Sequence, residues 1–345
     1  MPNLSADRQK HPKHLLSRTQ VIFLLLLLLL FSVSAGLLFG SVPIRFRDIA
    51  ACLLGQEVAP KTAVLIRSVR LPRVIGGLFA GIGLATAGVI LQNVMNNTLA
   101  GPGTIGINSG SGFAVMLAML FFPASSGVLS AAAFLGAFIT SIAVFSLAYF
   151  ADSSRTTIVL AGITISSFLN AGINMMKLLH TDLAVDLTAF MLGSLSGLTS
   201  RKLFLPCLCI AAAFIISLFF TSAINVMSLG DDIARSLGLR VTGTRFALLL
   251  LASLLAGSVV SYAGLLSFIG LIVPHICRRL FGSDARFLLP CSALLGGSFV
   301  LLCDLLGRML ASPYELPAGI IMSLLGGPFF LYLLLRKKGG RRVNA

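Results

Sequence analysis

The sequence predicts an all-α, polytopic membrane protein with ten transmembrane helices. Of its 345 residues, 57% are hydrophobic and only 11% are charged, whereas soluble domains carry roughly 25% charged residues. The mean hydropathy is +0.99. So few charged side chains cannot cover the surface of a 36.3 kDa globule. Lipid must therefore cover much of the folded chain.

Long stretches without Asp, Glu, Lys or Arg mark the membrane spans. The longest extends from Val74 to Ala151, and the others are residues 19–44, 156–176, 203–230, 246–277, 287–303 and 316–335. A helix needs about 20 apolar residues to cross roughly 30 Å of hydrocarbon. Strands of a membrane barrel alternate apolar and polar residues over about 10 positions, and these runs are too long and too continuous for that pattern.

Gly, Pro and polar residues divide the two longest runs. The stretch after Val74 breaks at 92–97, at 101–103 and again at 123–127, and the run 246–277 breaks near 262–264. We therefore expect spans at 20–40, 74–95, 104–122, 127–150, 157–177, 203–225, 246–262, 265–280, 287–307 and 317–335. Together they form a single domain over 20–335, between two basic tails, 1–19 and 336–345.

Basic residues set the expected orientation. An even number of spans places both termini on one side, and the basic tails place that side in the cytoplasm. One external segment, 41–73, departs from the rule because it carries six basic residues. Either an acidic partner docks there, or the side chains are solvated or extend to the interface. The six are Arg45, Arg47, Lys61, Arg67, Arg70 and Arg73.

Other function classes find little support. A signal peptide is an alternative for the first span, because Val33-Ser34-Ala35 resembles a cleavage site, but the apolar run continues to Phe39 and favours a retained helix. The charges lie at loop ends, which does not favour nucleic-acid binding. Cys207 and Cys209 lack supporting His residues, so no metal site is expected. No Gly-Lys dipeptide occurs, hence no P-loop, and any ATP must bind to another chain.

The internal segment 229–245 carries the signals of a short helix between two spans. Asp231 is suited to capping it, Asp232 suits the positive end of its dipole, and Gly238 ends it in a Schellman motif. Ile233 and Leu237 give it an apolar face. A helix this short needs a surface to pack against, so we expect a soluble partner to bind here. An amphipathic turn at the membrane interface is the alternative.

A set of ordered motifs along the sequence resembles a known family. The motifs are Arg70-Leu-Pro-Arg73, Gln92-Asn-Val-Met-Asn-Asn97, Leu99-Ala-Gly-Pro-Gly-Thr-Ile-Gly106 with Gly110, Leu192-Gly-Ser-Leu-Ser-Gly197, residues 229–239, Gly270-Leu-Ile-Val-Pro-His275, and Leu316-Pro-Ala-Gly319 with Gly326-Gly-Pro-Phe-Phe330. Over about residues 20 to 335 they resemble the membrane permease subunits of ABC importers for iron-siderophore complexes, haem and cobalamin.

The resemblance implies a permease of the type II ABC importer class in a bacterial cytoplasmic membrane. Such a chain pairs with a second permease, as a homodimer or a heterodimer, and binds two cytoplasmic ATP-binding subunits. An external substrate-binding protein delivers the cargo. The chain itself is then no enzyme and holds no cofactor, because ATP and magnesium bind to the partner ATPase.

The resemblance also assigns roles to particular residues. Docking of the binding protein falls to Arg70, Arg73 and Arg308. Coupling to the ATPase falls to Gly230, Asp231, Asp232, Ala234, Arg235, Leu237 and Gly238. A cytoplasmic gate lies at about residues 152–157, with Ser154, Arg155 and Thr156 in it, and the fifth span lines the route. On that span Asn170 and Asn174 are four residues apart and either face the pathway or form hydrogen bonds between helices.

An iron-siderophore complex is the first expectation for the cargo, with haem and cobalamin as alternatives. A secondary transporter that works without an ATPase is the alternative from another class. The chain departs from the family at Asn96-Asn-Thr-Leu-Ala-Gly-Pro102, where R-N-P-L-A-D-P is common. A positive and a negative residue are lost together there, so an ion pair is absent, and this favours one half of a heterodimer.

Overall fold

The computed structural model describes residues 18–40, 42, 44–122, 125–151, 154–312 and 314–339. Most of the two basic tails therefore lies outside the described residues. Within them the regular structure is helical. The helices are α1 (Arg18–Leu38), α2 (Phe46–Leu53), α3 (Pro60–Val64), η1 (Leu65–Arg70), α4 (Leu71–Val94), η2 (Pro102–Ile105), α5 (Ile107–Phe121), α6 (Ser126–Ala151), α7 (Arg155–Leu179), α8 (Thr181–Leu192), α9 (Ser200–Phe219), α10 (Thr221–Met227), α11 (Asp231–Ser236), α12 (Val241–Ala263), α13 (Ile269–Phe281), α14 (Ala285–Leu310) and α15 (Ala318–Gly339).

Each of the ten predicted spans falls on helical structure. Among the described residues, seven helices are long and apolar enough to cross a membrane, when Pro60–Val94 is counted as one continuous helix. The α5 helix and the apolar part of α15, Ala318–Leu333, are shorter, and α13 has 13 residues. The all-α membrane architecture is thus confirmed, while ten crossings remain a prediction.

Three local features differ from the sequence-based expectation. The sixth predicted span divides into α9 and α10 at Phe220. A further helix, α8, lies between the fifth and sixth spans, with Asp182 in its first turn, where a carboxylate is favoured by the helix dipole. The second span also begins earlier than expected, because the helix continues from Pro60 through a π-helical turn, η1, that carries Arg67 and Arg70.

The α4 helix forms the centre of the bundle. It packs most extensively against α14 and α12, and nearly every residue from Pro72 to Val94 is buried. Glycines permit this packing, as is usual between membrane helices. A Cβ at Gly81 would overlap the Gly296 carbonyl of α14, and one at Gly88 would overlap the backbone of α13 at Gly270. The helices are in backbone contact at both places.

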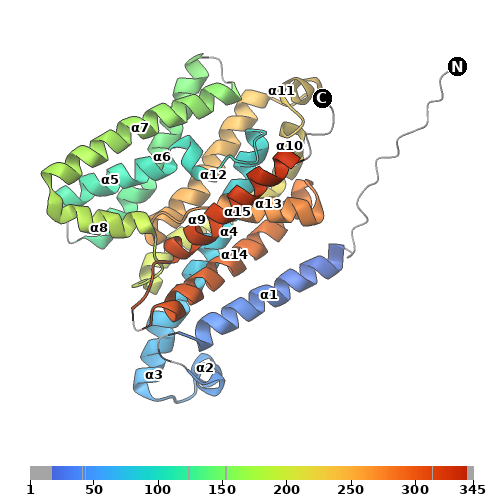
Figure 1. The fold of residues 1–345 in the computed structure, drawn as a ribbon. Helices are drawn as coiled ribbons and strands as arrows, with labels where there is room; N and C mark the ends of the chain where they lie inside the picture. The colour runs from blue at the N-terminus through green and yellow to red at the C-terminus, as the bar shows by residue number, and fades with distance from the viewer. Residues whose placement is uncertain are drawn as a thin grey trace.

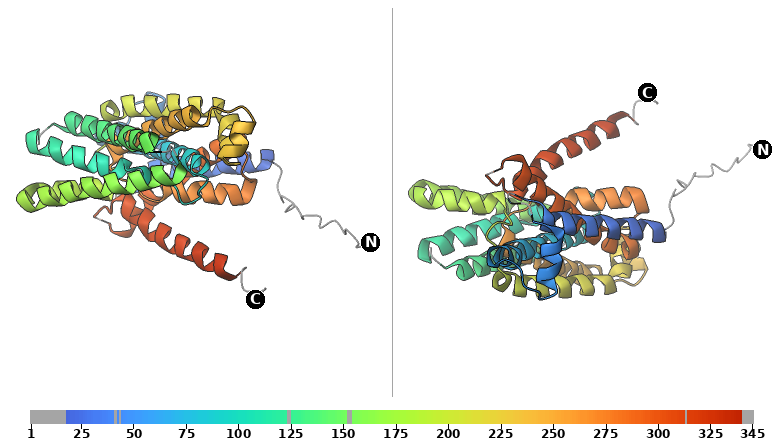
Figure 2. Two further views of the ribbon diagram at one scale, coloured as in Figure 1. Left: turned by 90° about the horizontal axis from the view of Figure 1, so that it is seen from above. Right: turned by 90° about the horizontal axis from the view of Figure 1, so that it is seen from below.

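The outer helices are much less buried. In the most apolar windows, 78% of the residues of Pro60–Val94, 72% of those of α12 and 67% of those of α14 are buried, against 22% in α7. The α15 helix leans away from the bundle in both views of Figure 2. The fold therefore has a tightly packed centre and outer helices with largely exposed surfaces.

The two ends of the bundle carry different features. The start of α1, α11 and the later part of α15 lie towards one end, and α2 and α3 lie at the other (Figure 1). A small apolar cluster of Ile44, Ile49, Cys52 and Ile66 packs α2 against η1. The predicted coupling segment and the predicted docking segment therefore lie at opposite ends.

Candidate coupling site and arginine cluster

The predicted coupling segment forms a helix of six residues, α11. It ends as expected: Gly238 has a φ of 81°, its N–H donates to the Arg235 carbonyl at 2.9 Å, and the Leu239 N–H donates to the Ala234 carbonyl at 3.0 Å. These two bonds are the Schellman pattern. At the other end, Gly230 occupies the N-cap position and no side chain caps the helix. The expected cap by Asp231 is therefore not formed, and its carboxylate is available for contacts with other helices.

Asp231 forms two ion pairs with arginines of other helices. The Asp231 carboxylate lies 2.8 Å from Nη2 of Arg155 at the start of α7, and 2.5 Å from Nη2 of Arg245 in the first turns of α12. The same Nη2 of Arg155 also donates to the Met227 carbonyl at the end of α10, at 2.9 Å. One carboxylate therefore fastens α11 to two separate spans.

Charge and burial set the protonation of this carboxyl group. Burial raises the pKa of Asp231, but the hydrogen bond from Arg245 and the positive charges of Arg245, Arg155 and Arg235 outweigh it, so the pKa lies below its usual value of 3.8. The ionised form is therefore favoured in the folded chain. Stability from this contact is present above the unfolded pKa and is lost as the pH falls through the folded one.

The α10 helix is attached to α14 by a second polar contact. Asn225 Nδ2 donates to Asp284 Oδ1 at 2.9 Å, and Asn225 Oδ1 accepts from the Ala285 N–H at 2.8 Å. The hydrogen bond from Asn225 is the main reason why the pKa of Asp284 is lowered. Both ends of the α10–α11 unit are thus tied to spans.

The outer face of α11 has no packing partner among the described residues. Ala234 is fully buried, whereas Ile233 is 50% and Leu237 is 61% exposed. Asp232 and Arg235 are also exposed. An apolar face with a charged rim on so short a helix is typical of a protein-binding surface.

The predicted gate residues lie beside this helix. Ser154 caps α7, because its Oγ accepts from the Thr157 N–H at 3.1 Å. Arg155 reaches α11 as described, and Thr156 is exposed. The preceding loop residues that the sequence assigned to the gate, 152 and 153, lie outside the described residues. The structure thus brings the start of α7 and the coupling helix together.

At the opposite end, Arg73 lies at the centre of an ion cluster. Its Nη2 is 3.0 Å from Asp304 Oδ1 and its Nη1 is 2.7 Å from Glu315 Oε2. The Arg308 Nε lies 3.2 Å from Asp304 Oδ2. Asp304 therefore sits between two arginines, and it is only 2% exposed.

The remaining donors of the cluster cap the end of α1. Arg308 donates to the Gly36 carbonyl through Nη1 and Nη2, each at 3.3 Å. Arg70 Nη1 donates to the carbonyls of Leu37 and Phe39, at 2.8 and 2.6 Å. The last carbonyls of a helix lack partners within it and attract cations. The arginines therefore hold α1 against α4 and α14.

This geometry bears directly on the predicted docking residues. Arg70, Arg73 and Arg308 do lie together, but they are 5%, 6% and 4% exposed, and their guanidinium groups are engaged inside the chain. Exposed basic side chains of the same end include Arg45, Arg47, Lys61 and Arg67. Docking through the three arginines themselves stays a prediction, and the structure gives them a stabilising role in addition.

The two asparagines of α7 are both exposed. Asn170 Nδ2 donates to Ser109 Oγ of α5 at 3.2 Å, so Asn170 forms the bond between helices that was one of its alternatives. The exposed face of α7 also carries Thr164, Ser167 and Asn174. A face bathed in lipid is apolar, so this polar stripe is more typical of an aqueous route or of a contact with another subunit.

Comparison with known proteins identifies the family of this chain. Residues 24–336 match the FecCD transport family. The chain belongs to the FecCD transport family. The Fe(3+)-citrate import system permease protein YfmE of Bacillus subtilis (strain 168) is 38% identical over 315 residues, which cover 91% of this chain and 93% of that protein. The hemin transport system permease protein HmuU of Yersinia pestis is 33% identical over 331 residues, covering 94% of this chain and 97% of that protein.

Solved structures agree with the family. One, described as an inward-facing conformation of a metal-chelate type ABC transporter, is similar with a TM-score of 0.83 and 28% identity, covering 92% of this chain and 99% of that chain. PsaBC from Streptococcus pneumoniae in complex with Fab has a TM-score of 0.56 at 18% identity and covers 82% of this chain and 94% of that chain, which shows a similar fold only. The resemblance drawn from the FecCD motifs is confirmed.

Sequence reasoning missed the partners that complete both sites. It singled out Asp231 and Arg155 separately, but it did not identify Arg245, which is 2% exposed. The pairing of Asp304, an acid within an apolar span, with the two arginines was not predicted either. A basic residue at the first turns of a span, opposite an acid in the preceding loop, is the signal that was available for Arg245.

Replacing Asp304 by Asn is expected to destabilise the chain strongly. Removing one member of a buried ion pair costs about 3–5 kcal/mol, because the remaining charge is left without compensation. Glu315→Gln is the matched control, since its carboxylate is 32% exposed and exposed pairs contribute about 0–1 kcal/mol. Thermal unfolding in detergent measures both variants, and equal losses of stability would contradict the assignment.

Asp231→Asn is expected to loosen α11 from α7 and α12. It leaves the buried Arg245 without its carboxylate, at a cost of about 1–3 kcal/mol. Asp232→Asn serves as the control for stability, because this neighbouring carboxylate is exposed. Hydrogen exchange of the α11 amides provides the measurement. Faster exchange in Asp231→Asn alone is the expected result, and unchanged exchange in both variants would refute the double ion pair.

Proposed function

We propose that this chain is the permease subunit of an ATP-driven importer and that it forms part of the pathway for an iron-siderophore complex. The match of residues 24–336 to the FecCD family carries the proposal. The ATPase is a separate pair of cytoplasmic subunits, and an external binding protein supplies the cargo. No chemistry is assigned to the chain itself, which contributes a passage and a coupling surface.

The relatives support a chelated ferric ion as cargo. Their names specify Fe(3+)-citrate, iron(3+)-hydroxamate and hemin, which share iron held in an organic ligand. A siderophore complex is the proposed cargo because most of these relatives carry one or an equivalent ferric chelate. Haem is the second candidate, and it is favoured by the 33% identity to a hemin permease over 97% of that protein.

The proposed coupling runs through α11. Its exposed face, Ile233 and Leu237 with Asp232 and Arg235 beside them, inserts into the ATPase. Closure of the ATPase on ATP then displaces α11. Because Asp231 is paired with Arg155 and Arg245, the displacement reaches the starts of α7 and α12 together. The force is applied at the end of α7 where the gate residues Ser154, Arg155 and Thr156 lie.

The pathway itself is proposed to lie along the polar stripe of α7 that includes Asn170 and Asn174. Apolar side chains such as Phe168, 77% exposed, flank this stripe. A second permease of the same kind or of a related sequence would cover α7 and the leaning α15 and enclose an aqueous route. Such a route holds its cargo weakly, so a large complex is released as readily as it is bound.

The proposed location is a bacterial cytoplasmic membrane. The coupling helix then faces the cytoplasm together with both termini, as the basic tails predict. The opposite end, with α2 and α3, faces the binding protein. There the exposed Arg45, Arg47, Lys61 and Arg67 provide charge for the encounter, while the arginine cluster fixes the shape of the surface beneath them.

Binding of the ATPase is expected to fail in the variant Leu237→Glu. The side chain is 61% exposed, so the fold should persist, whereas a carboxylate placed in an apolar contact should disrupt it. Leu54→Glu is the matched control, because Leu54 is 75% exposed at the opposite end. Copurification of the ATPase in detergent is the readout.

Two results would refute this function. One is full retention of the ATPase by Leu237→Glu. The other is cargo uptake by vesicles that contain the chain without any ATPase or nucleotide, which would favour a secondary transporter.

Docking of the binding protein is expected to weaken in Arg47→Glu/Lys61→Glu and to depend on salt. Charges exposed on a rim govern the rate of encounter and the orientation more than the final affinity. Arg279→Glu, an exposed residue near the other end of the bundle, is the control. Surface plasmon resonance at two ionic strengths measures the association rate. A rate that the double variant leaves unchanged would rule out docking at α2 and α3.

A further inference from the structure

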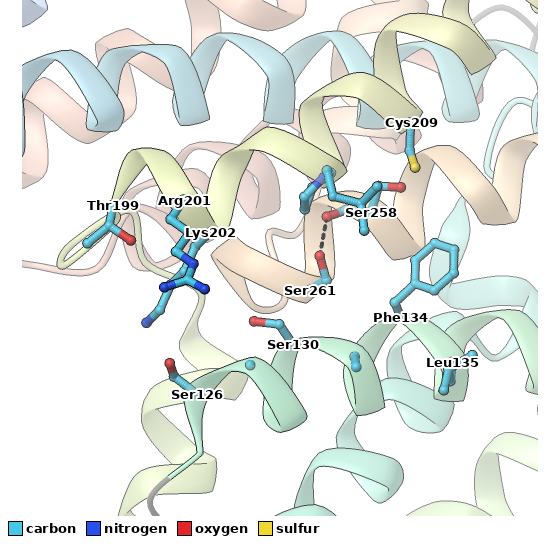
Figure 3. A pocket seen from close by; sticks show the side chains of 14 residues that line it. Ser126, Ser130, Phe134, Leu135, Thr199, Arg201, Lys202, Cys209, Ser258 and Ser261 are labelled. Carbon is cyan, nitrogen blue, oxygen red and sulfur yellow. Dashed lines mark hydrogen bonds between the residues drawn. The ribbon is translucent and has the colours of Figure 1, made fainter.

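A cavity of about 720 Å³ opens on the flank of the bundle between α6, α9 and α12, distinct from both sites described above. Its two ends differ in character (Figure 3). Arg201 and Lys202 lie at one end together with Thr199 and Ser126, and Phe134 and Cys209 lie at the other. The cavity is therefore amphipathic along its length.

The polar end is suited to an anion. Arg201 and Lys202 are both exposed, and neither forms a salt bridge with any of the described residues. They occupy the first turn of α9, which begins at Ser200 without a side-chain cap. The free N–H groups at the start of a long helix add to the positive potential. No carboxylate from the described part of the chain lines the cavity, so these charges are available to an external anion.

A buried hydroxyl group gives a second indication of an occupant. Ser258 of α12 lines the cavity and is 1% exposed, yet its Oγ finds no hydrogen-bond partner among the described residues. In addition, Pro206 of α9 lines the cavity and has no N–H, so the Lys202 carbonyl lacks its α-helical donor. Polar groups without partners in an apolar wall are unfavourable unless a ligand or water reaches them.

The apolar end is continuous with the surface that faces lipid. Leu135 and Leu205 line the cavity and are 51% and 65% exposed. Along α9 the cavity extends from Arg201 to Cys209, which is about 12 Å at 1.5 Å per residue. This length is close to the roughly 15 Å depth of one leaflet of a hydrocarbon core about 30 Å thick. An occupant would therefore come sideways from the membrane, with its charge at the surface and its chain inside.

We propose that this cavity is a binding site for one anionic phospholipid. Arg201, Lys202 and the start of α9 hold the phosphate, and an acyl chain packs along Phe134, Leu135 and Leu205. Basic residues near the membrane surface attract anionic headgroups electrostatically. The proposal does not depend on the cargo or on the ATPase, and it places a lipid as a structural wedge between α6 and α9.

Native mass spectrometry of the full-length chain, released from detergent with added lipid, tests the proposal. Phosphatidylglycerol is compared with phosphatidylcholine of the same acyl chains, and with sodium phosphate alone. Arg201→Gln/Lys202→Gln removes the anion site, and Ala131→Phe fills the cavity from α6. Arg47→Gln/Lys61→Gln is the control, because it removes two exposed charges from another face.

The expected result is selective binding of phosphatidylglycerol to the wild type and the control. Binding should be at least about tenfold weaker in Arg201→Gln/Lys202→Gln, in keeping with the loss of two interfacial cations, and should be abolished by Ala131→Phe. Equal binding of both lipids would overturn the proposal, because acyl packing alone would then explain it. Binding of free phosphate in place of lipid, or equal binding by all variants, would overturn it as well.

Discussion

Hydrocarbon cannot solvate a charge, and this constraint determines where the chain places its ionic groups. At each end of the bundle one aspartate lies between two arginines: Asp304 between Arg73 and Arg308, and Asp231 between Arg155 and Arg245. The three residues around Asp231 come from three helices, whereas Asp304 and Arg308 both lie on α14 and Arg73 lies on α4. Neutralisation inside the protein therefore also serves to join elements that are distant in sequence, and the positions of α1, α7, α11 and α12 follow from it.

The two clusters have different surroundings, and their roles differ accordingly. The cluster around Asp304 is buried except for Glu315 and includes the last carbonyls of α1, so it resists change. The cluster around Asp231 is open on one side, where Leu237 and Ile233 remain exposed. A partner that grips this open side can move it without first breaking a buried pair. Under the proposed function, the cluster around Asp304 holds one end of the FecCD chain fixed, while the proposed coupling end stays open to a partner.

Much of this architecture could be predicted from the sequence, because spans and helix ends depend on local composition. The absence of charge located the helices, and Gly238 with Leu239 specified the end of α11. The ion pair between Arg73 and Asp304 could not be predicted, since the two residues are 231 positions apart and only the packing of α4 against α14 brings them together. The burial of Arg70 was unexpected for the same reason: its partners are backbone carbonyls, which leave no trace in side-chain patterns. The α8 helix was missed because its short amphipathic sequence lies between spans.

The unequal burial of the helices has a consequence for how the protein assembles. Backbone contacts at Gly81 and Gly88 hold α4 against α14 and α13, so these three helices form a rigid core within a single chain. The α7 helix differs from these helices, because only 22% of its apolar window is buried. Under the proposed function, a second permease covers this exposed helix, and the transport pathway is complete only in the assembled pair.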